Sequence, residues 1–385
     1  MDAIQKKYTC AVVPCADYSE AETALSRALA AIDGLSLVKP GMRVVIKANL
    51  VAPMKPEQAA TTHPALVCAL VKMLKARGAS VTVGDSPGGF FTVPALNSVY
   101  QATGMTEAEK CGAELNRNVC YHTIRIDGVS MKELTYTDYL DDCDLLIDFA
   151  KLKAHGMVGM SAAVKNLYGV IPGLLKPETH YIYPKVEDFA DMLVDINEHF
   201  RPALSLIDAV VGMEGNGPTM GTPRHIGTVI AALSPYEADA AAAKLIGLKP
   251  DDVPSLMAAK RRGLCSGNIE DIALFGDTDS LAVSDFKSVP RRSIAFLKGS
   301  DVPLIGGMIE KVLTHKPAPV KKLCVACKKC MNLCPAKAIT MVKRGKYVYP
   351  RIDRKKCIRC FCCQEFCPKG AMIVRRSRLI KLLQK

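Results

Sequence analysis

Short apolar runs alternate with segments of helical period along the first 315 residues. The runs predict strands at residues 10–13, 43–51, 81–84, 144–149, 203–211, 225–233 and 272–275. Apolar positions of helical period predict helices at residues 19–32, 64–77, 186–199 and 235–246. Strands that alternate with helices of this length are typical of a mostly parallel sheet covered on both faces. We therefore expect an α/β domain.

The C-terminal part has a different pattern, in which one cysteine spacing occurs twice. Both copies read C-x-x-C-x-x-C-x-x-x-C-P: Cys324, Cys327, Cys330 and Cys334 in the first, and Cys357, Cys360, Cys363 and Cys367 in the second. In the bacterial iron–sulfur run of this spacing, the fourth cysteine ligates the cluster of the other copy. We therefore expect two [4Fe–4S] clusters, one on Cys324, Cys327, Cys330 and Cys367 and one on Cys357, Cys360, Cys363 and Cys334.

Zinc is the competing cofactor, because four-thiolate zinc sites also use paired C-x-x-C motifs. Zinc ribbons usually separate the two pairs by a long loop and need no third cysteine two residues on. Disulfides are disfavoured in a chain without a secretory signal. Cys362 lies one residue out of register with Cys363 and is expected to be a bystander thiol.

Residues 320–372 resemble the two-cluster ferredoxins. Between the two motifs, residues 338–342 and 347–349 flank Arg344-Gly345-Lys346 and predict a short hairpin. Residues 371–374 would add a further strand. The resemblance implies a small α+β ferredoxin-like domain.

The proline-rich stretch Lys316-Pro-Ala-Pro-Val320 is expected to be a linker between the two parts. The predicted domains are therefore an α/β domain at 1–315, the linker at 316–320, a ferredoxin-type domain at 321–374 and a basic tail at 375–385. The N-terminus lacks a signal-peptide pattern, and no uncharged apolar stretch approaches the roughly 18 residues of a membrane helix. These features predict a cytoplasmic protein.

Charge is divided sharply between the two parts. Residues 316–385 hold 20 Lys and Arg residues against Asp353 and Glu365, whereas residues 1–315 hold 31 against 36 acidic residues. So basic a domain favours an acidic redox partner, such as a ferredoxin or flavodoxin, and speeds its docking. Nucleic acid is the competing partner, but stacking aromatics are not interleaved with the basic residues and no groove-reading motif is present.

Polar loops follow several of the predicted strands in the α/β part. In open α/β sheets, ligands bind beyond the carboxyl ends of the strands. The candidate site residues there are Lys153, His155, Lys165, His180 and Glu214. In the interpretation as an enzyme, Lys151, Lys153 and Lys165 clamp an anion, His155 or His180 delivers protons, and Glu214 acts as a general acid or base. A hydrogen-bonded structural histidine is the alternative for each histidine.

Several blocks of residues 8–310 resemble the family called domain of unknown function 362. They include Lys47-Ala-Asn49, Thr62-His63-Pro64, Gly84-Asp-Ser86, Lys151-Leu-Lys-Ala-His155, Ala163–Gly173, the Lys176 and His180 pair, Ile207–Pro218 and Asp239. In that family the domain often precedes a ferredoxin module, as it does here. The resemblance implies a shared α/β fold and one site formed by these loops.

Together these patterns predict an iron–sulfur electron-transfer protein. In one version it is a ferredoxin-dependent reductase whose α/β domain binds an anionic substrate. In the other it is a non-enzymatic electron carrier, or a maturation factor that serves a partner enzyme. The sequence alone leaves these versions open.

Overall fold

The computed structural model describes residues 8–289 and 316–375. The chain divides into two compact units, the first made of residues 1–173 and 187–289 and the second of residues 174–186 and 290–385. Each unit is described by itself.

The first unit is built around a nine-stranded sheet with the order β11-β1-β10-β9-β7-β2-β3-β4, and β8 pairs with β7 off this path. Its strands are β1 (Cys10–Pro14), β2 (Arg43–Ala48), β3 (Ser80–Gly84), β4 (Glu114–Leu115), β7 (Leu145–His155), β8 (Gly159–Ser161), β9 (Leu204–Glu214), β10 (Thr222–Ala232) and β11 (Leu274–Phe275). The central neighbours β9, β7, β2, β3 and β4 are parallel, which confirms the predicted α/β fold with its mostly parallel sheet. β10 is antiparallel to both β1 and β9.

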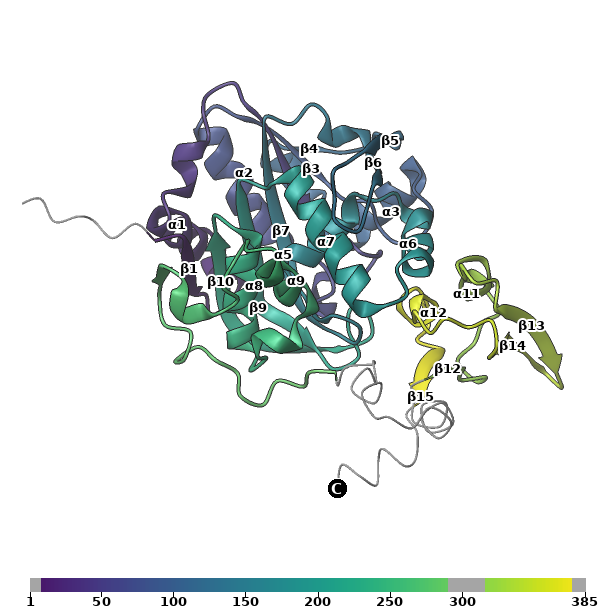
Figure 1. The fold of residues 1–385 in the computed structure, drawn as a ribbon. Coiled ribbons are helices and arrows are strands. Elements are labelled where there is room, and N and C mark those ends of the chain that lie inside the picture. Colours follow the sequence, from purple (N-terminus) through teal and green to yellow (C-terminus); the bar gives the residue numbers. More distant parts are fainter. Residues whose placement is uncertain (1–7, 290–315, 376–385) are drawn as a thin grey trace, which may run out of the picture. The chain divides into compact units, whose positions relative to one another are not determined.

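Helices cover both faces of this sheet (Figure 1). They are α1 (Ala21–Ala31), α2 (Pro64–Ala76), α3 (Val93–Ala102), α4 (Glu107–Lys110), α5 (Ala163–Asn166), α7 (Val186–Phe200), α8 (Pro235–Leu245) and α9 (Pro254–Arg261). α1 and α2 pack against each other, while α8 packs on α5 and α9. The helices expected at residues 19–32, 64–77, 186–199 and 235–246 are all present within a residue or two.

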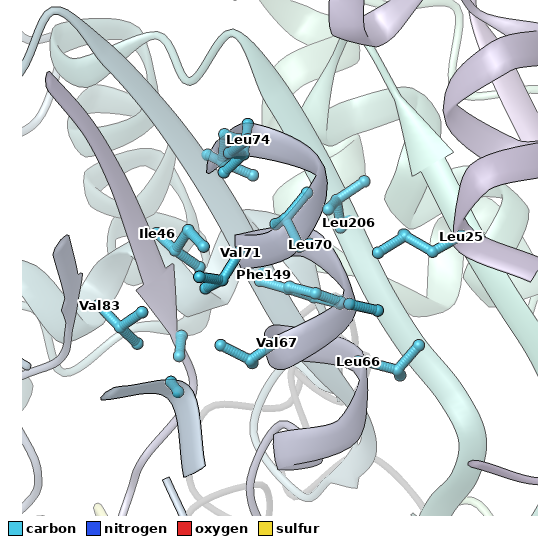
Figure 2. Close-up of a cluster of buried hydrophobic side chains, with 14 of the residues drawn as sticks. Leu25, Ile46, Leu66, Val67, Leu70, Val71, Leu74, Val83, Phe149 and Leu206 are labelled. Carbon is cyan, nitrogen blue, oxygen red and sulfur yellow. The ribbon is translucent and has the colours of Figure 1, made fainter. Parts of the chain in front are cut away.

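The core beneath α2 is made of aliphatic side chains from the helix and apolar side chains from the parallel strands. Figure 2 shows Leu66, Leu70 and Leu74 along α2 beside Phe149 of β7 and Leu206 of β9. All five are fully buried. Leucines at this spacing share one face of a helix, so a single apolar stripe attaches α2 to the sheet.

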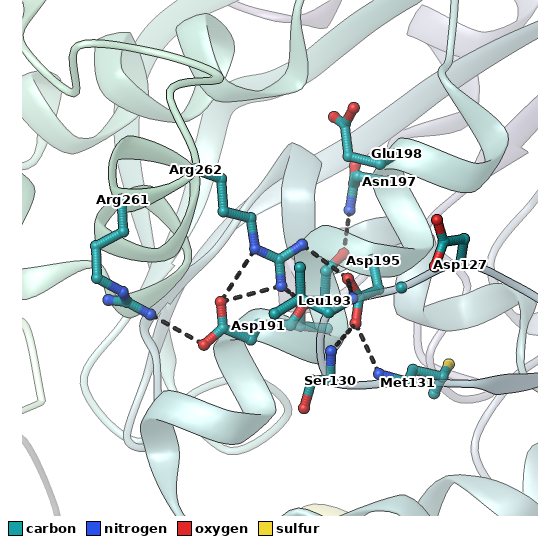
Figure 3. A network of polar contacts seen from close by, with 12 residues as sticks. Asp127, Ser130, Met131, Asp191, Leu193, Asp195, Asn197, Glu198, Arg261 and Arg262 are labelled. Atoms are coloured by element: carbon teal, nitrogen blue, oxygen red, sulfur yellow. Dashed lines mark hydrogen bonds and ion pairs between the residues drawn. The ribbon is translucent and has the colours of Figure 1, made fainter.

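A charged network joins α7 to α9 and to the loop before β6 (Figure 3). The carboxylate of Asp195 accepts hydrogen bonds from the backbone N–H groups of Ser130 and Met131, at 2.7 and 2.8 Å. Arg262 donates to Asp195 at 2.7 Å and also pairs with Asp191 at 3.0 Å. One buried carboxylate therefore orders the turn that follows the strand β5 (Tyr121–Arg125) and precedes β6 (Glu133–Thr137).

Two strands extend further than the apolar pattern predicts. The run at residues 144–149 predicts a strand that ends at Phe149, but β7 continues to His155. β9 likewise continues to Glu214. All residues of β7 are buried, including both lysines of Lys151-Leu-Lys153, which the pattern had assigned to a loop. The parallel pairs place the carboxyl ends of β3, β2, β7 and β9 along one edge of the sheet.

The described residues of the second unit form two small antiparallel sheets. Its elements are α6 (Lys176–Ile182), β12 (Lys316–Pro319), α11 (Lys329–Asn332), β13 (Ile339–Arg344), β14 (Tyr347–Ile352), α12 (Cys362–Glu365) and β15 (Met372–Arg375). β13 and β14 form the predicted hairpin, with Gly345 at its turn in the left-handed region (φ 58°). The strand predicted at residues 371–374 is β15.

The stretch expected to be a linker is part of this unit. Lys316 to Pro319 form β12, which pairs with β15 residue by residue from Lys316 with Arg375 to Pro319 with Met372. Alternate prolines are compatible with a strand at a sheet edge, where a missing N–H costs no ladder bond. The predicted basic tail lies outside the described residues except for Arg375.

Candidate functional site

The eight motif cysteines line two separate cavities in the second unit. Cys324, Cys327, Cys330 and Cys367 line one, with Met341, Pro350 and Met372 among its other walls. Cys334, Cys357, Cys360 and Cys363 line the other, together with Ile339, Ile352 and Phe361. Each set of four combines three cysteines of one motif with the fourth cysteine of the other. We call these two sites the first cage and the second cage.

The two motifs fold into the same backbone conformation. Ala326 and Lys328 in the first loop have positive φ angles of 56° and 60°, and Arg359 and Phe361 at the equivalent positions have 61° and 63°. Such left-handed residues bend the chain tightly, so cysteines two residues apart can face one cavity. The fourth cysteines of the two motifs also have equivalent surroundings.

Each fourth cysteine accepts a hydrogen bond from a backbone N–H group four residues further on. Ala338 N–H donates to Cys334 Sγ at 3.3 Å, and Ala371 N–H donates to Cys367 Sγ at 3.2 Å. Hydrogen bonds of this kind to ligating sulfur stabilise the thiolate form and tune cluster potential.

The donor set of each cage suits a metal cluster. Burial, followed by the charges of Cys367, Cys327 and Cys324, raises the pKa of Cys330 to about 11. Burial also raises the pKa of Cys357 and Cys363. Burial opposes ionisation of these three thiols, whereas a bound cationic cluster would stabilise the thiolate form of its ligands. The cages therefore fit the iron–sulfur groups expected from the motif.

Cys362 also lines the cavity of the second cage, although it is not one of the four predicted ligands. Its side chain is 1% exposed and hydrogen-bonds the side chain of Cys360. This contact gives the ninth cysteine of the unit a direct link to a predicted ligand.

In the first unit, buried polar side chains gather at the carboxyl ends of β2, β3 and β7. Lys47 Nζ lies 2.8 Å from Asp85 Oδ1, and both side chains are almost completely buried. Asp85 also accepts hydrogen bonds from the backbone N–H groups of Leu50 (2.6 Å) and Ser86 (2.8 Å). The ion pair thus ties the end of β2 to the loop that follows β3.

Asparagine side chains extend this network to β7. Asn166 Nδ2 donates to Asp148 Oδ1 at 2.7 Å, and Asn49 Nδ2 donates to Asn166 Oδ1 at 2.9 Å. Lys153 Nζ donates to Asn49 Oδ1 at 3.0 Å and to the carbonyl oxygen of Ala60 at 2.8 Å. The side chains of Lys47, Asn49, Asp85, Asp148, Lys153 and Asn166 therefore form one connected group, which we call the polar network.

Lys151 forms a separate buried pair. Its Nζ donates to Asp208 Oδ2 and to the Tyr18 hydroxyl oxygen, each at 2.8 Å. The Tyr18 ring stacks on His63 with 3.5 Å between ring centroids. Burial lowers the pKa of Lys151, and burial lowers the pKa of His63 to about 4. The carboxylate of Asp208 neutralises Lys151, which the sequence had offered as part of an anion clamp.

Two buried carboxyl groups near the polar network have raised pKa values. Burial raises the pKa of Asp148 well above its ordinary value. Burial raises the pKa of Asp239 to about 7, although the backbone N–H groups of Ala163 and Val164 oppose that shift. Burial therefore favours the neutral form of Asp148, and the pKa of Asp239 lies near neutral pH.

The candidate site residues occupy different parts of the chain. His155 ends β7 and accepts from the backbone N–H of Met157 at Nδ1 (3.1 Å), which places the proton of a neutral ring on Nε2. Glu214 ends β9 and accepts from the backbone N–H of Lys287 at 3.1 Å. Lys165 is half-buried, with Nζ 4.9 Å from the centroid of the Tyr168 ring.

These five residues are divided between the two units. Lys153 belongs to the polar network. The loop after β9 passes close to the end of β7: a Cβ on Gly217 would lie 1.9 Å from the carbonyl oxygen of Ala154. His180 lies in α6, which belongs to the second unit. The roles assigned to these five residues stay predictions.

The sequence interpretation missed Asp148 and Tyr18. Asp148 lies inside the apolar run Leu145-Leu-Ile-Asp-Phe-Ala150, where a charged residue in a fully buried parallel strand was the available signal. Tyr18 offered no comparable signal, because its contact with Lys151 depends on a residue 133 positions away.

The chain belongs to the family described as domain of unknown function (DUF362), whose model matches residues 44–244. A model described as a 4Fe–4S dicluster domain matches residues 323–371. The predicted fusion of these two parts is thereby confirmed. The dicluster domain supports an iron–sulfur electron-transfer role for the chain.

One curated relative is a thylakoid-associated protein of Synechocystis sp., which is 32% identical over 235 residues, or 60% of this chain and 70% of the relative. Among solved structures, the lactate racemase apoprotein from Thermoanaerobacterium thermosaccharolyticum matches with a TM-score of 0.37 and 14% identity, over 60% of this chain and 56% of that chain. A likeness at that level carries no argument about activity.

None of the helices within residues 8–289 and 316–375 combines the length and the apolar character needed to cross a membrane.

Proposed function

We propose that the chain is a two-cluster iron–sulfur protein whose second unit passes single electrons. The observation that carries this proposal is the division of eight cysteines between two cages, each completed by the fourth cysteine of the other motif. Two clusters held in one small unit are well suited to relay electrons between an external donor and a bound acceptor. The match to a dicluster domain supports the same conclusion.

The crossed ligation can be tested by pairing alanine substitutions. C324A with C367A removes two ligands of one proposed cluster and should leave about four iron atoms per chain after anaerobic reconstitution. C357A with C367A removes one ligand from each cluster and should leave almost none. Iron and sulfide analysis with EPR of the reduced proteins makes the measurement. If ligation is not crossed, the C357A and C367A protein should instead keep more iron than the C324A and C367A protein. A zinc-loaded, colourless protein contradicts the proposal altogether.

For the α/β unit, we propose a ferredoxin-dependent reductase site for an anionic substrate. Buried lysine, asparagine and aspartate side chains at the carboxyl ends of β2, β3 and β7 support a site there, since ligands of open α/β sheets bind at this edge. In this proposal Lys153 and Lys165 hold the anion, His155 supplies protons, and Glu214 is the general acid or base.

A co-purifying anion, identified by native mass spectrometry, tests this part of the proposal. Lys153→Met keeps the length of the side chain and removes its charge, so binding of the identified anion should weaken at least tenfold in calorimetry. Lys72→Met is the matched control, because Lys72 lies on the exposed side of α2 with 57% of its side chain accessible. Equal affinity of the Lys153 and Lys72 variants contradicts the site, and no anion at all contradicts the substrate class.

The pairing of Lys151 with Asp208 and of Lys47 with Asp85 favours a second candidate function. Lysines neutralised within the fold can be structural, as in a docking platform. The chain would then be a non-enzymatic electron carrier or a maturation factor for a client enzyme. It would be reduced by its partner without any bound small molecule, which the same mass spectrometry would reveal.

The place of this protein in the cell is also a proposal. We propose a cytoplasmic protein, as the sequence predicted. The thylakoid association of its Synechocystis relative suggests contact with a membrane surface as an alternative. Fractionation of cells at low and high salt, followed by immunoblotting, separates these two locations.

A further inference from the structure

The two cages share a backbone conformation but differ in exposure to solvent. In the first loop, Val325 is 58% exposed, and Cys327, Lys328 and Lys329 are also exposed. In the second loop, the residue equivalent to Lys328 is Phe361, which is 4% exposed. Because the two loops share one backbone conformation, their difference in exposure comes from the side chains and their surroundings and not from the shape of the loop.

The surface around the first cage combines apolar and basic residues. Leu323 is 51% exposed and Val325 58%, and both flank the predicted ligand Cys324. The exposed lysines around them are Lys321, Lys322, Lys328 and Lys329. We call these six residues the port surface. Exposed apolar side chains beside a reactive group, surrounded by charge of one sign, are typical of an interaction surface.

The charge of the port surface is not balanced nearby in the sequence. Residues 316–352 contain no Asp or Glu, so every charged side chain over that stretch is basic. A field of this kind attracts an acidic protein over long distances and speeds its association at low ionic strength. The apolar residues then contribute to affinity once the partner is in place.

We propose that the port surface docks a small acidic one-electron carrier protein, so that electrons enter or leave the chain through the first cage. This inference rests on the proposed function, because it assumes that both cages hold clusters. The exposure of Cys327 brings the first cage closer to the surface than the second, whose loop residues Phe361 and Cys362 are buried. Electron transfer slows steeply with distance, so the exposed cage is the efficient point of exchange.

The test uses the full chain, with an acidic two-cluster ferredoxin as the electron donor and stopped-flow measurement of cluster bleaching. Lys328→Glu with Lys329→Glu reverses two charges of the port surface and should slow reduction at least tenfold at low salt. Lys343→Glu with Lys346→Glu is the matched control, because it makes the same change of net charge at exposed positions by the β13–β14 turn. The control should slow reduction about twofold or less.

A readout without electron transfer completes the test. Calorimetry with the oxidised ferredoxin should show weaker binding for the port variant than for the control, and a smaller dependence on salt. Leu323→Ser with Val325→Ser should weaken binding while leaving the salt dependence unchanged. The inference would be overturned if the port and control variants lost equal amounts of reduction rate and affinity. It would also be overturned if the wild-type rate did not respond to salt.

Failure of the inference is distinguishable from failure of the proposed function. Dithionite reduces clusters without docking, so every variant should bleach fully with it. A chain that dithionite does not bleach lacks the clusters, and the proposed function fails. A chain that dithionite bleaches but whose port variant reacts with the ferredoxin as fast as wild type retains the proposed function and contradicts the port surface.

Discussion

At the scale of single residues, Cys362 gives the most direct test of how this chain sets the potential of a cluster. Its buried side chain hydrogen-bonds Cys360, a predicted ligand of the second cage. A hydrogen bond to a ligating sulfur stabilises the more negative reduced cluster and raises its potential. Cys362→Ala should lower the potential of one cluster by on the order of 50 mV, since a bond to a charged group is worth about 1–2 kcal/mol.

EPR-monitored redox titration makes that measurement. Cys362→Ser is the matched control, because a serine hydroxyl can keep donating to the sulfur and should hold the potential nearer to that of the wild type. A change in iron content in the Cys362→Ala protein would show instead that Cys362 is itself a ligand.

Loss of the buried ion pair between Lys47 and Asp85 should strongly destabilise the first unit. Asp85→Asn leaves a buried ammonium group without its carboxylate and should destabilise the first unit by about 3 kcal/mol. Lys110→Gln breaks an exposed pair with Glu107 and should leave the free energy of unfolding almost unchanged. Urea unfolding followed by circular dichroism compares the two. A small effect at Asp85 would mean that water or another group replaces the carboxylate.

The grouping of the eight motif cysteines around two cavities could be predicted from sequence, whereas the lysine pairs could not. Cysteine spacing directly encodes how a loop wraps a cluster, so local sequence is enough. The partner of Lys151 is Asp208, 57 residues further on, and their contact exists only because β7 and β9 are neighbours in the sheet. A list of basic residues therefore overstates the free positive charge at the site.

At the scale of elements, the segment after α5 depends on a glycine that lies against the polar network. A Cβ on Gly169 would lie 2.4 Å from Asp85 Oδ1 and 2.5 Å from Lys47 Nζ. Gly169→Ala should therefore push this segment away and cost about 2–3 kcal/mol of stability, as overpacking of a core does. It should also weaken binding of any anion found at this edge of the sheet.

The control for that substitution is Gly247→Ala. Gly247 has a positive φ of 68°, and no atom lies within 4 Å of the position that a Cβ would take there. Alanine at this position therefore adds backbone strain of about 1 kcal/mol without a steric clash. Hydrogen exchange of residues 163–173 distinguishes the two variants. Unchanged protection there in Gly169→Ala would mean that the segment accommodates the methyl group.

Seven strands and four helices of the first unit were predictable, but the ends of strands were not. The helix that starts at Pro64 was indicated by Thr62-His63-Pro64, and the structure ends it at Ala76 before Gly78. β7 exceeds its predicted length because its last residues are polar yet buried, and burial is supplied by side chains from other elements. The short strands β4, β5 and β6 fall in a stretch where apolar alternation is weak, and were missed.

At the scale of the whole molecule, the half-buried His63 and the buried Asp239 should make stability depend on pH in opposite directions over the same range. Burial lowers the pKa of His63 from 6.5 to about 4, so the folded chain binds fewer protons than the unfolded chain in this range. Its contribution is therefore lost as the pH falls from 6.5 to 4. Burial raises the pKa of Asp239 from 3.8 to about 7, so its contribution is lost as the pH rises through that range.

Because these two contributions oppose each other, substitution of either group should reveal the pH dependence of stability that the other group contributes. His63→Asn keeps an oxygen that can accept from the backbone N–H of Ala65, as His63 Nδ1 does at 3.2 Å. Relative to wild type, this variant should gain about 2 kcal/mol as the pH falls from 6.5 to 4. Asp239→Asn should instead gain stability relative to wild type as the pH rises from 4 to 7. Urea unfolding across this pH range tests both signs, and two difference curves of the same slope would contradict the assignment of a neutral histidine and a protonated carboxyl to the folded state.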